Sequence, residues 1–251
     1  MRALLAKEWL ELVRSRRLLV LCVVLLFFGI LSPLTARYMG DIFAMMSESM
    51  QGIVIQLPEP SIHEAIVQYL ANFSENYPLA IILVAMACIV AERERGTLAM
   101  VLARPVIRWQ IVLSKYLALL GMLLIALALG GLGALYYSII LFGGPAFVDF
   151  LLLNLAGALY LSVILALTVL ASTLARSTVA AGALSLGFWL TLSLVGSLPG
   201  LRGWLPPALV TQAAELGLGS RPDVWQAALV ALTFIGVALA GACLALQRQE
   251  L

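Results

Sequence analysis

Six long apolar runs separated by short polar segments dominate the sequence. Gly143, Gly144 and Pro145 follow the third run and predict a stop and a tight hairpin to the fourth. The second run is only about 13 residues long, so we expect the amphipathic segment before it to extend it outward. A helix needs roughly 20 apolar residues to cross a bilayer. The pattern therefore predicts an all-α polytopic membrane protein with six transmembrane helices, at 18–34, 79–91, 111–142, 150–175, 179–198 and 224–246.

The segment before the first run has the periodicity of an amphipathic helix. It is too long and too amphipathic for the charged start of a signal peptide, although 18–31 resembles an apolar signal core. We expect it to lie along the cytoplasmic membrane surface as an interfacial helix. One face carries Leu5, Trp9, Leu12 and Val13, and the opposite face carries Lys7, Glu8, Glu11 and Arg14.

Two further segments predict structure on the outer side of the membrane. Ser61 followed by Glu64 has the form of a capping box and opens a helix that we place at the outer interface. The sequence from Pro199 to Pro207 breaks the chain after the fifth run, and Trp204 there is an interface anchor. The prediction is an interfacial helix at 1–17 and a permease domain at 18–251, with a loop at 92–110 and outer loops at 37–77 and 199–223.

Helix packing in lipid requires close backbone approach, which small residues permit. Such residues recur at helical spacing on three of the predicted helices. This spacing favours packing within the bundle and is also compatible with dimerisation. The positions are Ala118, Ala126, Gly130 and Ala134 on the third helix, Ala181 and Ser185 on the fifth, and Gly236 and Ala240 on the sixth.

Composition and charge fix the class and the orientation. The 251 residues are 63% apolar and 11% charged, which excludes a water-soluble globular fold. Twelve Lys and Arg residues fall on one side of the predicted bundle and three, Arg37, Arg202 and Arg221, on the other. The positive-inside rule therefore places both termini in the cytoplasm and the protein in the cell membrane. The twelve are Arg2, Lys7, Arg14, Arg16, Arg17, Arg93, Arg95, Arg104, Arg108, Lys115, Arg176 and Arg248.

The predicted helices lack the residues that several function classes require. We find no charged residue in the middle of a run, where ion-coupled carriers usually hold one. There is one histidine, His63, and no paired acids, GxSG or HExxH, so no catalytic, metal or cofactor residue is predicted. No phosphate-binding GxxxxGK[ST] loop occurs, so any ATP hydrolysis must come from a separate subunit.

Two minor features bear on metals. The outer methionines Met39, Met45, Met46 and Met50 offer soft thioethers suited to Cu(I), which leaves a metal contact open. The three cysteines show no ligand spacing, and we interpret them as buried packing residues.

The loop between the second and third runs is the most distinctive segment. It begins with Glu92-Arg93-Glu94-Arg95, breaks at Gly96, and continues as a short helix that Thr97 caps. An apolar face of Leu98, Val101 and Leu102 follows, and Arg104-Pro105 ends the helix. A short helix that projects into the cytoplasm from a bundle without a soluble domain is a natural contact for a partner.

These features resemble the permease subunits of type-two ABC exporters. The resemblance rests on Glu92-Arg93-Glu94-Arg95-Gly96-Thr97-Leu98, Arg104-Pro105, Arg108, Lys115, the leading amphipathic helix and the six spans, in order over most of the chain. It implies that the short helix is a coupling helix docked into an ABC ATPase subunit, and that the interfacial helix with Lys7, Trp9, Glu11 and Arg14 contacts the same subunit. It also implies a pair of permeases, with ATP and Mg bound by the ATPase.

The loop departs from the family pattern at two positions, Ala99 and Trp109, where the family often has an acid and polar residues. Docking is therefore expected to depend more on apolar contact and on the flanking arginines. The resemblance implies ATP-driven export by alternating access. The expected partners, besides the ATPase, are membrane lipid and a second copy of the chain, and no nucleic acid. A membrane scaffold that transmits ATPase force to an outer partner, and a passive channel, remain as alternatives.

Overall fold

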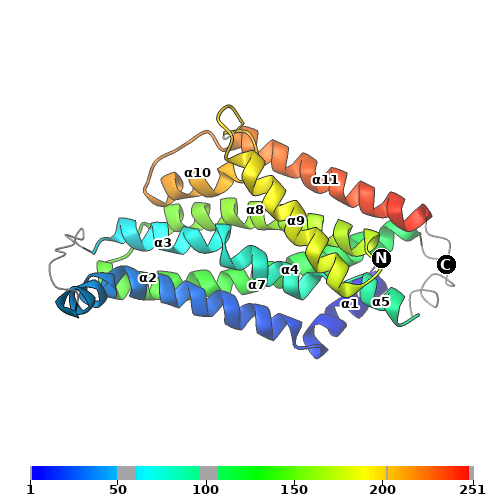
Figure 1. Ribbon diagram of the computed structural model, residues 1–251, viewed down its shortest axis with the longest axis horizontal. Helices are drawn as coiled ribbons and strands as arrows, with labels where there is room; N and C mark the ends of the chain where they lie inside the picture. The colour runs from blue at the N-terminus through cyan, green and yellow to red at the C-terminus, as the bar shows by residue number, and fades with distance from the viewer. Residues whose placement is uncertain (1, 50–59, 97–106, 202, 249–251) are drawn as a thin grey trace.

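The computed structural model describes residues 2–49, 60–96, 107–201 and 203–248, and the regular elements in these ranges are helices (Figure 1). The termini of the described chain lie at one end of an elongated bundle, which we call the near end; the opposite end is the far end. The helices are α1 (Arg2–Arg14), α2 (Arg17–Ser49), α3 (Ile62–Ser74), α4 (Asn76–Ala85), α5 (Val90–Glu94), α7 (Arg108–Phe142), α8 (Phe147–Leu174), α9 (Thr178–Gly196), α10 (Ala208–Gly217) and α11 (Trp225–Arg248).

Six stretches of helix are long and apolar enough to cross a membrane, which confirms the predicted all-α, six-span architecture. Each predicted run lies within, or within two residues of, one of these stretches. The hairpin predicted at Gly143 connects α7 to α8. The spans are Arg17–Gly40, Ile62–Glu94, Arg108–Phe142, Phe147–Leu174, Thr178–Gly196 and Trp225–Gln247.

The second span differs from its prediction. The capping box does start α3, where Ser61 Oγ accepts a hydrogen bond from the Glu64 N–H at 3.4 Å. However, α3 does not lie on an outer surface, because its apolar face, including Tyr69 and Phe73, is buried in the bundle. Since α3 contacts α2, α7, α8 and α10, residues 62–77 form the far half of a span and not part of an outer loop.

This longer span carries amides that the sequence prediction left outside the membrane. Asn72 Nδ2 donates to Ser32 Oγ of α2 at 2.7 Å, and Asn76 Nδ2 donates to Asn72 Oδ1 at 2.9 Å. Asn154 of α8 accepts from the Tyr69 hydroxyl at 2.8 Å. These bonds satisfy the polar groups inside the bundle, as a medium without water requires.

The helix of the second span breaks between α4 and α5, and Ser172 of α8 stabilises the break. Its Oγ accepts from the N–H groups of Ile89 and Val90, each at 3.1 Å, and donates to the carbonyl of Met86 at 2.8 Å. The hydroxyl thus replaces helical hydrogen bonds that the break removes. The break aims α5 away from the axis of α4 toward the near end (Figure 1).

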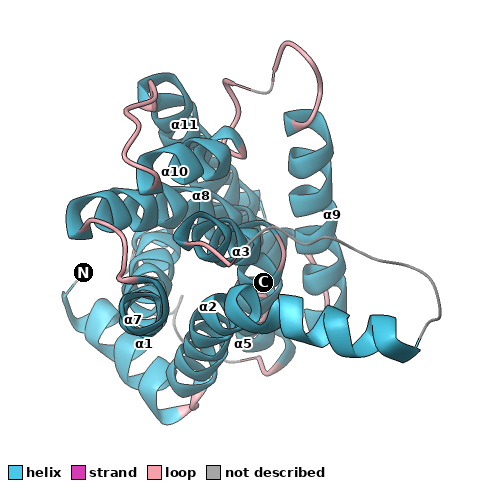
Figure 2. Cartoon of the chain, turned by 90° about the vertical axis from the view of Figure 1, so that its left-hand side faces the viewer, coloured by secondary structure: helices cyan, strands magenta, loops and turns pink. Residues whose placement is uncertain are grey.

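α8 is the most buried span, and it contacts α4, α7, α9, α10 and α11. α9 and α11 lie toward the outside of the bundle (Figure 2). The predicted small-residue positions on α7 and α9 are buried, but Gly236 and Ala240 of α11 are exposed. Within the bundle α11 packs through a different alanine stripe, Ala227, Ala231, Ala238 and Ala242, so of the two roles predicted for Gly236 and Ala240 only a contact with a second copy stays a prediction.

The closest approach of α2 and α7 occurs at two glycines. A Cβ on Gly130 would lie 2.8 Å from the carbonyl oxygen of Leu25, and a Cβ on Gly29 would meet the backbone of Gly130. Because backbone atoms, not flexible side chains, fill the space, only a residue without a Cβ allows this contact. The longest interface in the bundle therefore depends on Gly29 and Gly130.

We expect Gly130→Ala to separate α2 from α7 and lower the stability by about 1–3 kcal/mol, the usual cost of overpacking. Thermal unfolding of the detergent-solubilised protein measures the effect. Gly236→Ala is the matched control, since a Cβ there meets nothing within 4 Å and alanine is the better helix former. Equal melting temperatures for the two variants would contradict the close-contact argument.

Candidate functional site

At the near end, a lysine of α7 lies buried between two carboxylates from other helices. The side chain of Lys115 is 3% exposed. Its Nζ lies 3.0 Å from Glu8 Oε2 of α1 and 2.9 Å from Glu92 Oε1 of α5. Lys115 thus joins three elements that are far apart in the sequence, and each charge has an opposite charge at hydrogen-bond distance.

Lys7 of α1 completes the cluster from its exposed side. Its Nζ lies 2.9 Å from Glu92 Oε1, 3.0 Å from Glu8 Oε1 and 3.7 Å from Glu11 Oε2. Partial burial disfavours the charged form of Lys7, but the hydrogen bonds to Glu92 and Glu8 outweigh that effect and raise its pKa above the ordinary value. The ammonium group therefore stays charged, and the pairing persists, at neutral pH.

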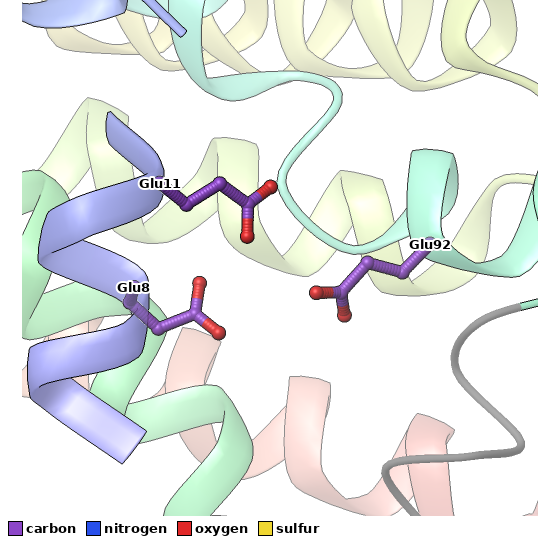
Figure 3. A group of neighbouring side chains, drawn as sticks. All are labelled: Glu8, Glu11 and Glu92. Carbon is purple, nitrogen blue, oxygen red and sulfur yellow. The ribbon is translucent and has the colours of Figure 1, made fainter. Parts of the chain in front are cut away.

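The three carboxylates of this cluster converge from α1 and α5 (Figure 3). One oxygen of each carboxylate lies within 4.8 Å of one oxygen of each of the other two, close enough to surround a metal ion. Lys7 and Lys115, however, already bring two positive charges to these oxygens. The arrangement is therefore that of a protein ion-pair network, in which lysines take the place that a cation would need.

The network corrects the predicted orientation of α1. Glu8, assigned to the polar face opposite Leu12, is buried at 7% exposure together with Leu12, while Val13 is 47% exposed. The reason is Lys115, which requires an acidic partner on the side of α1 that faces α7. The ring of Trp9 also packs on α7, next to Gly121, whereas Glu11 and Arg14 are exposed.

Arg93, the next residue of the loop, holds the end of α8. Its Nη1 donates to the carbonyl of Ala175 at 2.7 Å, and its Nη2 donates to the carbonyl of Thr173 at 3.0 Å. Carbonyls at the end of a helix lack partners within the helix and carry partial negative charge. A guanidinium group, with several donors in a fixed plane, satisfies two of them at once.

Glu94 holds the beginning of α9 by the converse interaction. Its Oε1 accepts from the N–H of Thr178 at 2.9 Å, and its Oε2 accepts from the Thr178 hydroxyl at 2.8 Å. An N-terminus presents unpaired N–H groups and partial positive charge, so it favours a carboxylate. Three consecutive residues, Glu92, Arg93 and Glu94, therefore connect α5 to α1 and α7, to α8, and to α9.

The returning end of the loop is fixed in the same way. Arg108, the first residue of α7, donates through Nη1 to the carbonyls of Leu246 and Gln247 at 3.2 and 2.6 Å. These carbonyls belong to the last turns of α11. Both ends of the loop are thus bonded to ends of membrane helices.

Of the remaining predicted loop residues, Arg95 and Gly96 are described and exposed. Gly96 has φ +70°, a left-handed conformation that favours glycine and ends α5, as the predicted break requires. Thr97, Leu98, Ala99, Val101, Leu102, Arg104 and Pro105 lie outside the described residues, as does Met50. Among the outer methionines, Met39 is exposed, and the side chains of Met45 and Met46 are outside the description.

Sequence reasoning missed Glu8, Ser172 and Thr178 as members of this site, and it used Lys115 only as a marker of the start of a span. A signal existed for Lys115, because it lies seven residues inside α7, where a charge needs a partner. Ser172 and Thr178 gave no such signal in the sequence, since hydroxyl side chains are common in membrane helices.

Comparison with known proteins assigns the chain to a protein family. The sequence pattern of the ABC-2 family transporter proteins matches residues 2–212, which includes α1, the loop and five of the spans. The chain belongs to the ABC-2 transporter family. It is also similar to an uncharacterized transmembrane protein of Bacillus subtilis, YxlG, with 32% identity over 225 residues, or 89% of this chain and 87% of that protein. The ABC-2 assignment makes the chain a multi-pass transmembrane component of a transporter.

Replacing Lys115 by Met should leave Glu8 and Glu92 without their shared buried cation. We expect a loss of about 3–5 kcal/mol in stability, the usual cost of removing one partner of a buried pair. Thermal unfolding in detergent measures this loss. Adding Glu8→Gln to Lys115→Met should restore part of it, because Lys7 then has one carboxylate fewer to balance. If the loss of stability in the double variant equalled the sum of the losses in Lys115→Met and Glu8→Gln alone, the result would argue against direct coupling between Lys115 and Glu8.

Proposed function

We propose that this protein is the permease subunit of an ATP-driven ABC exporter, and that a separate ABC ATPase docks on the coupling loop at 92–110. The observation that carries the proposal is the placement of Glu92, Arg93 and Glu94, which bond the start of the loop to α1, α7, α8 and α9. A partner that moves this loop therefore pulls on several spans together. ABC-2 permeases normally work with an ABC ATPase, which supports this choice of partner.

The proposed mechanism is alternating access in a pair of identical permeases above a pair of ATPase subunits. ATP closes the ATPase pair, the loops move toward each other, and the bundles open on the opposite side. ATP must bind one state more tightly than the other, since a ligand with equal affinity shifts no equilibrium. This chain binds no cofactor in the proposal, and ATP and Mg belong to the ATPase.

The proposed orientation places α1, the loop and both termini in the cytoplasm, with the protein in the cell membrane. The excess of Lys and Arg on the predicted cytoplasmic side, twelve against three over the whole sequence, supports it. The exposed apolar residues of α1, among them Leu10 and Val13, support its position along the membrane surface. In this arrangement 1–17 forms the interfacial helix and 18–251 the permease domain.

Docking is tested by replacing the predicted apolar face of the coupling helix. We expect Leu98→Asp together with Leu102→Asp to abolish co-purification of the ATPase from native membranes, because two charges would replace the apolar contact. Leu201→Asp is the control; Leu201 is exposed and follows the end of α9 that lies away from α5. Should the ATPase be absent from the wild-type sample despite intact permease, the proposal fails.

Transmission is tested separately from docking with Arg93→Gln, which removes a cation from the end of α8. We expect this variant to retain the ATPase but to lose the nucleotide-dependent change in distance between spin labels at Val23 of α2 and Leu194 of α9. Both labelled positions are exposed. Pulsed electron paramagnetic resonance with and without ATP and vanadate measures the distance.

The control for transmission is Arg95→Gln, since Arg95 is an exposed arginine of the same loop. It should preserve both ATPase binding and the distance change. A wild-type distance that does not respond to nucleotide would contradict alternating access, whereas an intact response in Arg93→Gln would show that the movement of α9 relative to α2 does not depend on the contact of Arg93 with α8.

A further inference from the structure

A groove runs between α7 and α8 toward the far end of the bundle, away from the coupling loop. It encloses about 300 Å³. One face of each helix lines it, with Ala128, Gly131 and Leu135 from α7 and Leu151, Asn154 and Ala158 from α8. The two helices are consecutive in the chain, yet they separate enough here to leave a space that side chains do not fill.

The floor of the groove contains polar groups that are already satisfied. Tyr69 Oη donates to Asn154 Oδ1 at 2.8 Å, and Asn154 Nδ2 donates to the carbonyl of Phe150 at 2.8 Å. A Cβ on Gly131 would lie 3.2 Å from Asn154 Oδ1, so this glycine forms the floor next to the amide. Since the remaining lining is almost entirely hydrocarbon, the groove selects an apolar ligand.

The groove opens onto a surface that is continuous with the lipid-facing sides of the two spans. Its rim consists of large, exposed apolar residues, namely Leu124, Leu132, Phe147 and Leu155. The exposed residues beyond the rim, including Tyr136, Ile140 and Val148, continue this surface on α7 and α8. Acyl chains of the bilayer therefore have direct access to the groove.

The size and the rim favour an acyl chain over a helix of a second copy. A helix with its side chains is about 10–12 Å wide and rises about 5.4 Å per turn, so a space of about 300 Å³ is smaller than one turn of such a helix. Helix contacts in lipid also depend on small residues, whereas this rim carries leucine and phenylalanine. An unfilled groove would lose dispersion contacts along both walls, and a flexible hydrocarbon chain restores them.

We propose that this groove binds one acyl chain of a bilayer phospholipid, which enters from the leaflet at the far end. The acyl chain packs along α7 and α8 and fills the space between these two helices. Recognition is of the hydrocarbon, so phospholipids with different headgroups bind alike. The proposal is independent of ATPase coupling, because the groove lies away from the loop residues.

The test uses the full-length protein in nanodiscs that contain a phospholipid with a photoreactive diazirine in the middle of one acyl chain. We expect light to attach the lipid preferentially to peptides lining the groove, compared with the exposed face of α11 around Leu232, which is farther from the near end. Phosphatidylcholine, phosphatidylethanolamine and phosphatidylglycerol probes should give the same pattern. Equal labelling of groove and α11 in the wild type would overturn the proposal without any variant.

Two substitutions that fill the groove sharpen the test. Ala128→Phe and Ala158→Phe should each abolish the preferential labelling, and native mass spectrometry should detect loss of one retained phospholipid. Ala240→Phe is the matched control, since Ala240 is exposed on α11 and does not line the groove. Unchanged groove labelling in both filled variants, with normal elution on size exclusion, would show that the lipid contacts the outer surface only. Preferential labelling of the groove by a probe with only one of the three headgroups would likewise contradict recognition of the acyl chain.

Discussion

A buried ammonium group must have anions beside it, and much of the near end of this protein is arranged around that requirement at Lys115. The residue lies inside a span, where an isolated charge is costly. Glu8 and Glu92 supply the anions from α1 and α5, which fixes both elements against α7. Lys7 then balances the excess negative charge from the exposed side. The position of α1, and of the start of the loop at 92–110, follows from these pairs.

Charged side chains also pair with backbone groups at the ends of the helices. A span that ends near the membrane surface leaves carbonyls or N–H groups without helical partners. Arg93 satisfies carbonyls at the end of α8, Glu94 satisfies the start of α9, and Arg108 satisfies the end of α11. Arg93 and Arg108, which the positive-inside rule counts toward the proposed orientation, are thus also groups that complete the ends of helices. Because each bond joins different elements, the loop is held by the bundle at both of its ends.

The sequence was sufficient to predict the six spans, the hairpin at Gly143 and the cap at Ser61, because length, apolar composition and capping residues act locally. It failed where a partner distant in the chain decides the outcome. Amphipathicity placed Glu8 on the outer face of α1, and only Lys115, more than a hundred residues later, explains its burial. Likewise, the apolar face of α3 was compatible with a membrane surface or with a bundle, and the neighbouring α2 and α8 determine which one it contacts.

The packing also suggests how movement of the loop would spread in the proposed mechanism. α9 is joined to α5 through Glu94 at its first turn, and Trp189 Nε1 donates to Tyr160 Oη of α8 at 3.3 Å midway along it. Beyond that point Leu190 and Leu194 are exposed. A displacement of α5 would tilt α9 about its middle contact and against the packing of its last turns, where Leu192 is buried and Gly196 lies against Pro207. α2 and α7, in contrast, are in backbone contact at Gly29 and Gly130 and would move as one body.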